Sequence, residues 1–110
     1  MNDKKGLEIA RRITSVLGAE YKPEKVILFG SFATGTAAKD SDIDLLIVKQ
    51  TSAPFYRRLE EVRRIVSSIR RGMPFDPIVM TPKELSDRLK MGDRFLKDIL
   101  QSGEVLYAKG

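Results

Sequence analysis

The stretch that decides the fold is residues 25–49, which read KVILFGSFATGTAAKDSDIDLLIVK. It joins two apolar runs, residues 26–29 and 43–48, through a turn that begins with Gly30 and Ser31. Short apolar runs rich in Val, Ile, Leu and Phe, bounded by small or polar residues, are typical of β-strands. The second run hardly alternates with polar residues, which indicates a strand buried on both faces. The stretch therefore predicts two strands joined by a small-residue turn.

Two carboxylates, Asp42 and Asp44, stand at the entrance of the second apolar run. Residues two apart in a strand project from the same face, so both carboxylates are expected to point to one place. The chain has no Cys and no His, so a metal held there needs oxygen ligands, which Mg²⁺ and Mn²⁺ accept. Asp is also common as a turn cap before a strand. Taken alone, the pair leaves both interpretations open.

A third acid, Asp76, interrupts the apolar segment of residues 75–80. An unpaired carboxylate buried there costs several kcal/mol, so it is expected to meet a cation or local N–H donors. In the turn, Gly30 permits close backbone approach to a phosphate, and Ser31 offers a hydroxyl and an N–H, although Gly-Ser taken alone is also an ordinary turn. If the strands are neighbours, phosphate site and acids share one sheet edge. Three acids can hold two metal ions, the arrangement suited to in-line attack at phosphorus.

Helices and further strands are expected to alternate along the rest of the chain. Apolar spacings of three and four predict helices over residues 7–17, 54–71, 81–91 and 93–101, with a brief helical turn over 31–35. Gly18 and Gly72 are expected to end the first two helices. Thr81 and Glu84 are expected to form a capping box at the start of the third. Residues 75–80 and 104–108 are predicted strands, the first at a sheet edge because Pro77 cannot donate a backbone hydrogen bond. We expect an α/β or α+β sheet with helices packed on it.

Composition narrows the class of protein. A length of 110 residues suits one domain, residues 1–110. No apolar run approaches the roughly 20 residues that span a bilayer, and the charged start lacks a secretory pattern, so a cytoplasmic location is expected. The absence of Cys and His excludes disulfides and Ser-His catalysis. A net charge of +5 suits a nucleic acid, a nucleoside triphosphate or an acidic protein surface.

The motif resembles a known family. Gly30-Ser31, ten residues, Asp42-Ile43-Asp44 and then the strand acid Asp76 are similar to the signature of the DNA polymerase beta superfamily of nucleotidyltransferases. The flanking SDIDLLIV and the tail FLKDILQSGEVLYA resemble more narrowly the minimal nucleotidyltransferases, antitoxin-type partners of HEPN-domain proteins. The resemblance implies a palm-like fold, a small mixed β-sheet flanked by helices. It also implies that the three acids are catalytic and bind Mg²⁺, with two ions expected and Mn²⁺ as an alternative.

The resemblance further implies a reaction and a partner. Gly30 and Ser31 would hold the triphosphate of ATP, and AMP would pass to a hydroxyl, expected to be a tyrosine of a HEPN toxin. Relatives frequently have Arg where this chain has Thr34, so that phosphate-binding charge is either absent or supplied by Lys39, Arg57 or Arg58. For each of these three residues, a solvated surface position is the expected alternative.

Other functions compete with this reading. One is a binding antitoxin of little or no activity that neutralises its HEPN partner by complex formation. An antibiotic-modifying nucleotidyltransferase normally needs further domains, and a nucleic-acid-binding module leaves the acids unexplained, because carboxylates repel phosphate without metal.

Overall fold

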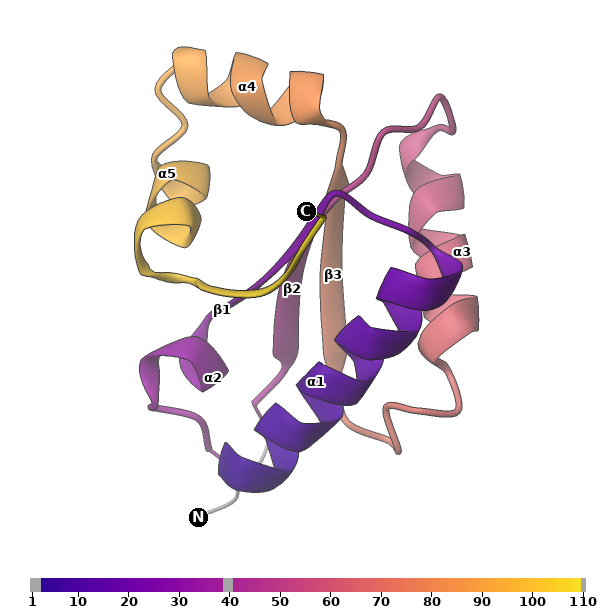
Figure 1. Ribbon diagram of the computed structural model, residues 1–110. Coiled ribbons are helices and arrows are strands. Elements are labelled where there is room, and N and C mark those ends of the chain that lie inside the picture. The colour runs from indigo at the N-terminus through magenta and orange to yellow at the C-terminus, as the bar shows by residue number, and fades with distance from the viewer. Residues whose placement is uncertain (1–2, 39–40, 110) are drawn as a thin grey trace.

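Four strands form one mixed sheet in the order β3-β2-β1-β4 (Figure 1). The computed structural model describes residues 3–38 and 41–109. β2 pairs antiparallel with β1 and parallel with β3, and β4 pairs antiparallel with β1. The strands are β1 (Lys25–Phe29), β2 (Ile43–Val48), β3 (Phe75–Met80) and β4 (Glu104–Ala108). The predicted α/β class with a small mixed sheet and flanking helices is confirmed.

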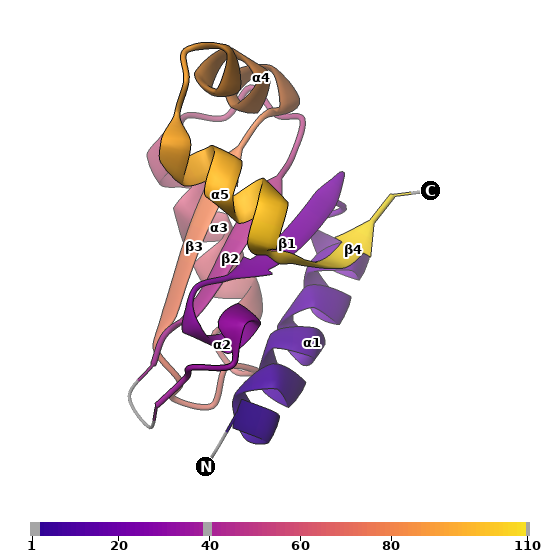
Figure 2. The same ribbon diagram turned by 90° about the vertical axis from the view of Figure 1, so that its left-hand side faces the viewer.

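Helices cover both faces of this sheet. α1 (Asp3–Glu20) and α3 (Phe55–Val66) pack on one face, while α4 (Pro82–Lys90) and α5 (Arg94–Ser102) pack on the other (Figures 1 and 2). The short α2 (Ser31–Thr34) follows β1. None of the described helices is long and apolar enough to cross a membrane.

The central position of β2 explains its unbroken apolar run. Alternate residues of a strand face opposite sides, and both sides of β2 are covered, so Leu45, Leu46 and Ile47 are all 0% exposed. Odd-numbered residues of β2 join the cluster under α1 and α3, and even-numbered residues join the cluster under α4 and α5. Asp44 therefore lies on the α4/α5 face of the sheet.

Two predictions are confirmed, namely the edge position of the strand that contains Pro77 and the capping box at the start of α4. β3, which contains Pro77, lies at the edge of the sheet. Thr81 caps α4 through its side chain, which accepts a hydrogen bond from the Glu84 N–H at 3.1 Å, while a Glu84 carboxylate oxygen accepts from the Thr81 N–H at 2.9 Å. The capping box predicted from sequence is therefore present.

Three helix ends were predicted wrongly. α1 begins at Asp3 rather than at residue 7. α1 also continues through Gly18 to Glu20, where Gly18 serves close packing against the Tyr107 ring instead of ending the helix; an added Cβ would lie 3.1 Å from the nearest atom of that ring. α3 ends at Val66 rather than Arg71. Arg71 has φ 52° and Gly72 has φ 78°, a left-handed backbone that no right-handed helix accommodates.

Candidate active site

The parallel pairing of β2 and β3 brings the three acids together. Asp44 and Asp76 are direct register partners, and Asp42 stands two residues before Asp44. One oxygen from each carboxylate can be chosen so that all three lie within 4.8 Å of one another. Asp42 and Asp76 are exposed and Asp44 is partly buried. The structure thus assembles the acidic cluster that the sequence motif predicts.

The turn that follows β1 lies directly against this cluster. Phe29 is the register partner of Asp44, which places Gly30 beside the carboxylate. A Cβ added at Gly30 would lie 2.2 Å from Asp44 Oδ2, and Gly30 has φ +76°. Any side chain at this position would both strain the backbone and collide with the carboxylate. The prediction that turn and acids share one edge of the sheet is confirmed.

Ser31 is held in place by the short helix α2. The Gly30 carbonyl accepts hydrogen bonds from the Ala33 and Thr34 N–H groups at 3.1 and 3.2 Å. Phe32 is buried, and its ring packs so closely on Gly6 of α1 that an added Cβ there would lie 2.0 Å from it. The buried Phe32 therefore anchors the turn and fixes where Ser31 stands relative to the acids.

The acidic cluster is electrostatically unfavourable on its own. The pKa of Asp44 is raised to about 6, first by burial and then by the negative charges of Asp76 and Asp42. Among the described residues, no Lys or Arg forms an ion pair with any of these three carboxylates. Like charges left together without a counter-charge are common at sites that bind a ligand.

The donor set fits hard divalent cations. Mg²⁺ takes oxygen ligands at about 2.1 Å. One oxygen from each of the three carboxylates lies within 4.8 Å of the other two. Such a set could hold one or two divalent cations. Bound cations would also relieve the repulsion that raises the pKa of Asp44.

Thr34 supplies no charge to the site. Its hydroxyl lies 2.9 Å from that of Thr36 and 3.4 Å from the Gly30 and Ser31 carbonyl oxygens, which it can reach as a donor. The side chain is thus engaged within its own turn. The hydroxyl completes the local hydrogen bonding of α2 instead of reaching outward.

The three residues considered as alternative sources of the positive charge missing at position 34 lie in different environments. Arg58 is buried and donates to the Ala53 and Val79 carbonyls and to both oxygens of Glu84, so its expected surface position and a phosphate-binding role are both wrong. Arg57 is exposed near the start of α3, which follows the far end of β2. Lys39 lies outside the described residues.

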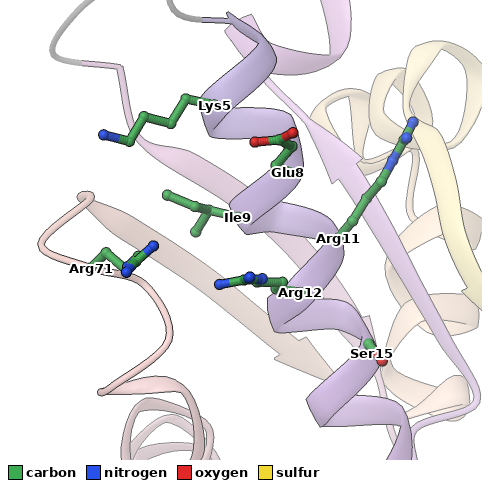
Figure 3. Close-up of a pocket in the computed structure, with 7 residues that line it drawn as sticks. All are labelled: Lys5, Glu8, Ile9, Arg11, Arg12, Ser15 and Arg71. Carbon is green, nitrogen blue, oxygen red and sulfur yellow. The ribbon is translucent and has the colours of Figure 1, made fainter.

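A basic hollow of about 480 Å³ lies on the other face of the sheet, along α1 (Figure 3). Arg12 and Arg71 extend toward one another across it, and Arg11 points away, toward Glu104, its ion-pair partner at 3.6 Å. The remaining lining residues are Lys5, Glu8, Ile9 and Ser15. The hollow is therefore a separate surface feature and not part of the acidic cluster.

Comparison with known proteins agrees with this geometry. Residues 10–106 match the nucleotidyltransferase domain family. The chain belongs to that family. Among relatives of this nucleotidyltransferase, two proteins of Methanocaldococcus jannaschii are named as candidate protein adenylyltransferases. One is 36% identical over 87 residues, 74% of this chain and 56% of its own length. The other is 29% identical over 109 residues, 97% of this chain and 100% of its own length. The chain thus spans about half of the first relative and all of the second.

Solved structures share the fold of this nucleotidyltransferase. A candidate nucleotidyltransferase from Sulfolobus solfataricus has a TM-score of 0.65 at 24% identity, covering 98% of this chain and 85% of its own. A chain of a toxin-antitoxin structure with AMP-PNP has a TM-score of 0.63 at 20% identity, covering 91% and 73%. At these identities the likeness concerns the fold alone.

Proposed function

We propose that this nucleotidyltransferase transfers AMP from ATP to a hydroxyl group of a partner protein and releases pyrophosphate. The observation that carries the proposal is the contact between Gly30 and the Asp44 carboxylate, inside a cluster completed by Asp42 and Asp76. That contact supports the proposal because it sets the turn beside three acids that could hold a metal ion. The proposal is supported by the family match and by the names of the two archaeal relatives.

The chain's own residues divide the work. Asp42 and Asp44 would hold both divalent cations, and Asp76 would hold the one nearer the acceptor; the bound ions would neutralise phosphate charge and polarise the α-phosphorus. The backbone N–H groups of Gly30 and Ser31, together with the Ser31 hydroxyl, would bind the β- and γ-phosphates. The acceptor oxygen attacks the α-phosphorus, the bond to the β-phosphate breaks, and pyrophosphate leaves with the electron pair. The acceptor proton would pass to Asp76, whose exposure leaves it open to a protein acceptor.

The proposed partner is a HEPN-domain toxin with a tyrosine as the acceptor, so that the chain acts as an antitoxin. The support is the sequence resemblance to minimal nucleotidyltransferases, together with toxin-antitoxin structures among the proteins of similar fold. The site is open at the surface and carries two exposed acids. A side chain presented by another protein could therefore reach it.

The test is incubation with α-labelled ATP, Mg²⁺ and the protein encoded in the neighbouring reading frame, which we propose to be a HEPN-domain protein. We expect label on the partner with the parent chain and none above background with Asp42→Asn, Asp44→Asn or Asp76→Asn. Asp87→Asn is the matched control, because Asp87 is an exposed acid of α4 that pairs with Lys83 at 2.8 Å. Absence of label with the parent, or equal label with the three cluster variants, would overturn the proposal.

A second candidate function is neutralisation of the partner by complex formation without catalysis. The observation that favours it is Thr34, whose hydroxyl is engaged in its own turn and which brings no positive charge to the phosphates. The basic hollow on α1 offers a separate surface for an acidic partner (Figure 3). Co-purification that survives nucleotide removal and substitution of all three acids, with toxicity still suppressed, would favour this function over transfer.

A further inference from the structure

An aromatic pair stands on the same face of the sheet as the acids. Phe29 ends β1, and Phe95 lies in the first turn of α5. Their ring centroids are 5.8 Å apart and their planes meet at 85°, an edge-to-face arrangement. In such a pair only one face of one ring is covered by the other. Phe95 is 55% exposed, so much of its surface remains available after the contact with Phe29.

The pair adjoins the acidic cluster. Phe29 is the register partner of Asp44, and it packs with the cluster under α4 and α5, as do the even-numbered residues of β2. Cross-strand partners on one face have Cβ atoms about 5 Å apart. The Phe29 side chain is therefore next to the Asp44 carboxylate, and Phe95 contacts Phe29 edge-to-face. Phe95 thus packs on the side chain that neighbours the acidic cluster.

The position of Phe95 is fixed by its neighbours in the chain. Asp93 caps α5 by accepting a hydrogen bond from the Leu96 N–H at 2.9 Å. Arg88 of α4 donates to the Asp93 carboxylate at 2.8 and 3.1 Å. Leu96 is 3% exposed, in the core under α5. Phe95 thus stands between a helix cap and a buried anchor, which hold the backbone at this position in place.

We propose that Phe95, backed by Phe29, is the platform on which the nucleobase of the bound nucleoside triphosphate stacks. The inference rests on the proposed function, because it assumes that the triphosphate binds at Gly30, Ser31 and the acids. Every base presents a π-face, and an exposed aromatic ring beside a phosphate site is suited to it. Stacking grows with the area of contact, so purine nucleotides gain more from this platform than pyrimidine nucleotides do.

The experiment compares ligands with and without a base. Binding of ATP and of inorganic tripolyphosphate, each with Mg²⁺ and without an acceptor, is measured by calorimetry on the parent, Phe95→Ala, Phe95→Leu and Phe55→Ala. Phe55 is the matched control because it is also 55% exposed, at the start of α3. We expect both Phe95 variants to bind ATP about tenfold more weakly and tripolyphosphate unchanged. Phe55→Ala should match the parent with both ligands.

The outcomes separate this inference from the function on which it rests. ATP affinity in Phe95→Ala and Phe95→Leu equal to that of the parent would overturn the stacking platform and leave the triphosphate site intact. Equal losses for ATP and tripolyphosphate would also overturn it, because the damage would then lie at the phosphates. A parent that binds neither ligand would overturn the triphosphate site and the platform together. Phe95→Leu keeps an apolar contact with Phe29, so it guards against a loss of packing in the alanine variant.

Discussion

The two ends of the β2–β3 pair treat charge in opposite ways. Near the start of these parallel strands, Asp42, Asp44 and Asp76 lie together, and no Lys or Arg in the described part of the chain pairs with them. Near their other end, the buried Arg58 donates to both carboxylate oxygens of Glu84, at 2.7 and 3.0 Å. The two ends therefore differ in charge compensation: the Arg58 charge is paired with a carboxylate, whereas the three carboxylates lie next to one another.

The pKa values record this difference. The pKa of Asp44 is raised to about 6 by burial and by its acidic neighbours. The pKa of Glu84 is lowered, first by its hydrogen bonds to Arg58 and then by the Thr81 N–H. A group whose charge is satisfied contributes to stability, whereas a group whose charge is opposed costs stability until a ligand arrives. The acidic end therefore fits our proposal that it binds a ligand, whereas the Arg58 end contributes to the stability of the fold.

Asp44→Asn should have the largest effect on AMP transfer, and it acts at the acidic end. We expect AMP transfer to fall about 10³-fold, because an amide cannot replace the charge that holds the cations. The metal-free variant should nevertheless be more stable than the parent at pH 7, because one of three repelling charges is gone. Transfer of labelled AMP and urea unfolding in chelator measure the two effects. A variant less stable than the parent in chelator would contradict our account of the cluster.

Glu84→Ala should break the comparison at the other end. It leaves the buried Arg58 guanidinium without its carboxylate and removes the capping box, so we expect a loss of about 3 kcal/mol in the free energy of unfolding. Below the unfolding transition, AMP transfer should stay within about twofold of the parent. Urea unfolding measures the loss. Lys83→Ala is the control, because it removes a neighbouring but exposed ion pair and should leave stability unchanged.

The two ends should also respond to pH with opposite signs. The raised pKa of Asp44 means that its contribution is fully present below its unfolded value, near 3.8, and is lost as pH rises through about 6. The lowered pKa of Glu84 means that its contribution is present above its usual value of 4.5 and is lost as pH falls below it.

Urea unfolding of the metal-free protein across pH 3 to 7 measures both slopes. Asp44→Asn should flatten the profile between about pH 4 and 6, and Glu84→Gln should flatten it below about 4.5. Saturating Mg²⁺ should remove the Asp44 slope in the parent. Profiles in which both variants change the same pH range would count against the assignment of opposite signs.

Thr34→Arg should have the smallest effect of these substitutions, and it acts at the acidic end alone. It adds a positive charge on α2, beside the turn that would hold the triphosphate. We expect the KM for ATP to fall about twofold to fivefold, as an exposed charge contributes modestly, with stability unchanged. Steady-state transfer kinetics measure it, with Thr36→Arg as a control two residues further along. A gain of the same size in both variants would point to a general effect of net charge.

The parts of the site that follow strand periodicity could be predicted from sequence. Two acids at i and i+2 before a buried run share one face of a strand, and an acid in the next β-like segment joins them when the parallel register pairs it with one of the two, as Asp76 pairs with Asp44. The Thr81 capping box is equally local. The end of α3 was not predictable, because Ile69 continues the apolar spacing while Arg71 adopts a left-handed backbone.

The burial of Arg58 and the exposure of Phe95 depend on tertiary contacts and could not be predicted from the sequence. Arg58 sits among other arginines of an amphipathic helix, and its burial depends on Glu84 arriving from α4. Phe95 follows the apolar pattern of α5, so its exposure beside Phe29 depends on how α5 lies across β1. Neither contact has a spacing or a motif that marks it in the chain.

The most direct test of the central claim is the number of divalent cations that the acidic cluster binds. Mn²⁺ titration followed by electron paramagnetic resonance, with a non-hydrolysable ATP analogue present, counts bound ions. We predict two Mn²⁺ per chain in the parent and in Asp87→Asn, and a loss of bound Mn²⁺ in Asp44→Asn. A parent that binds no Mn²⁺, or an Asp44→Asn variant that binds as many ions with the same affinity, would contradict the account.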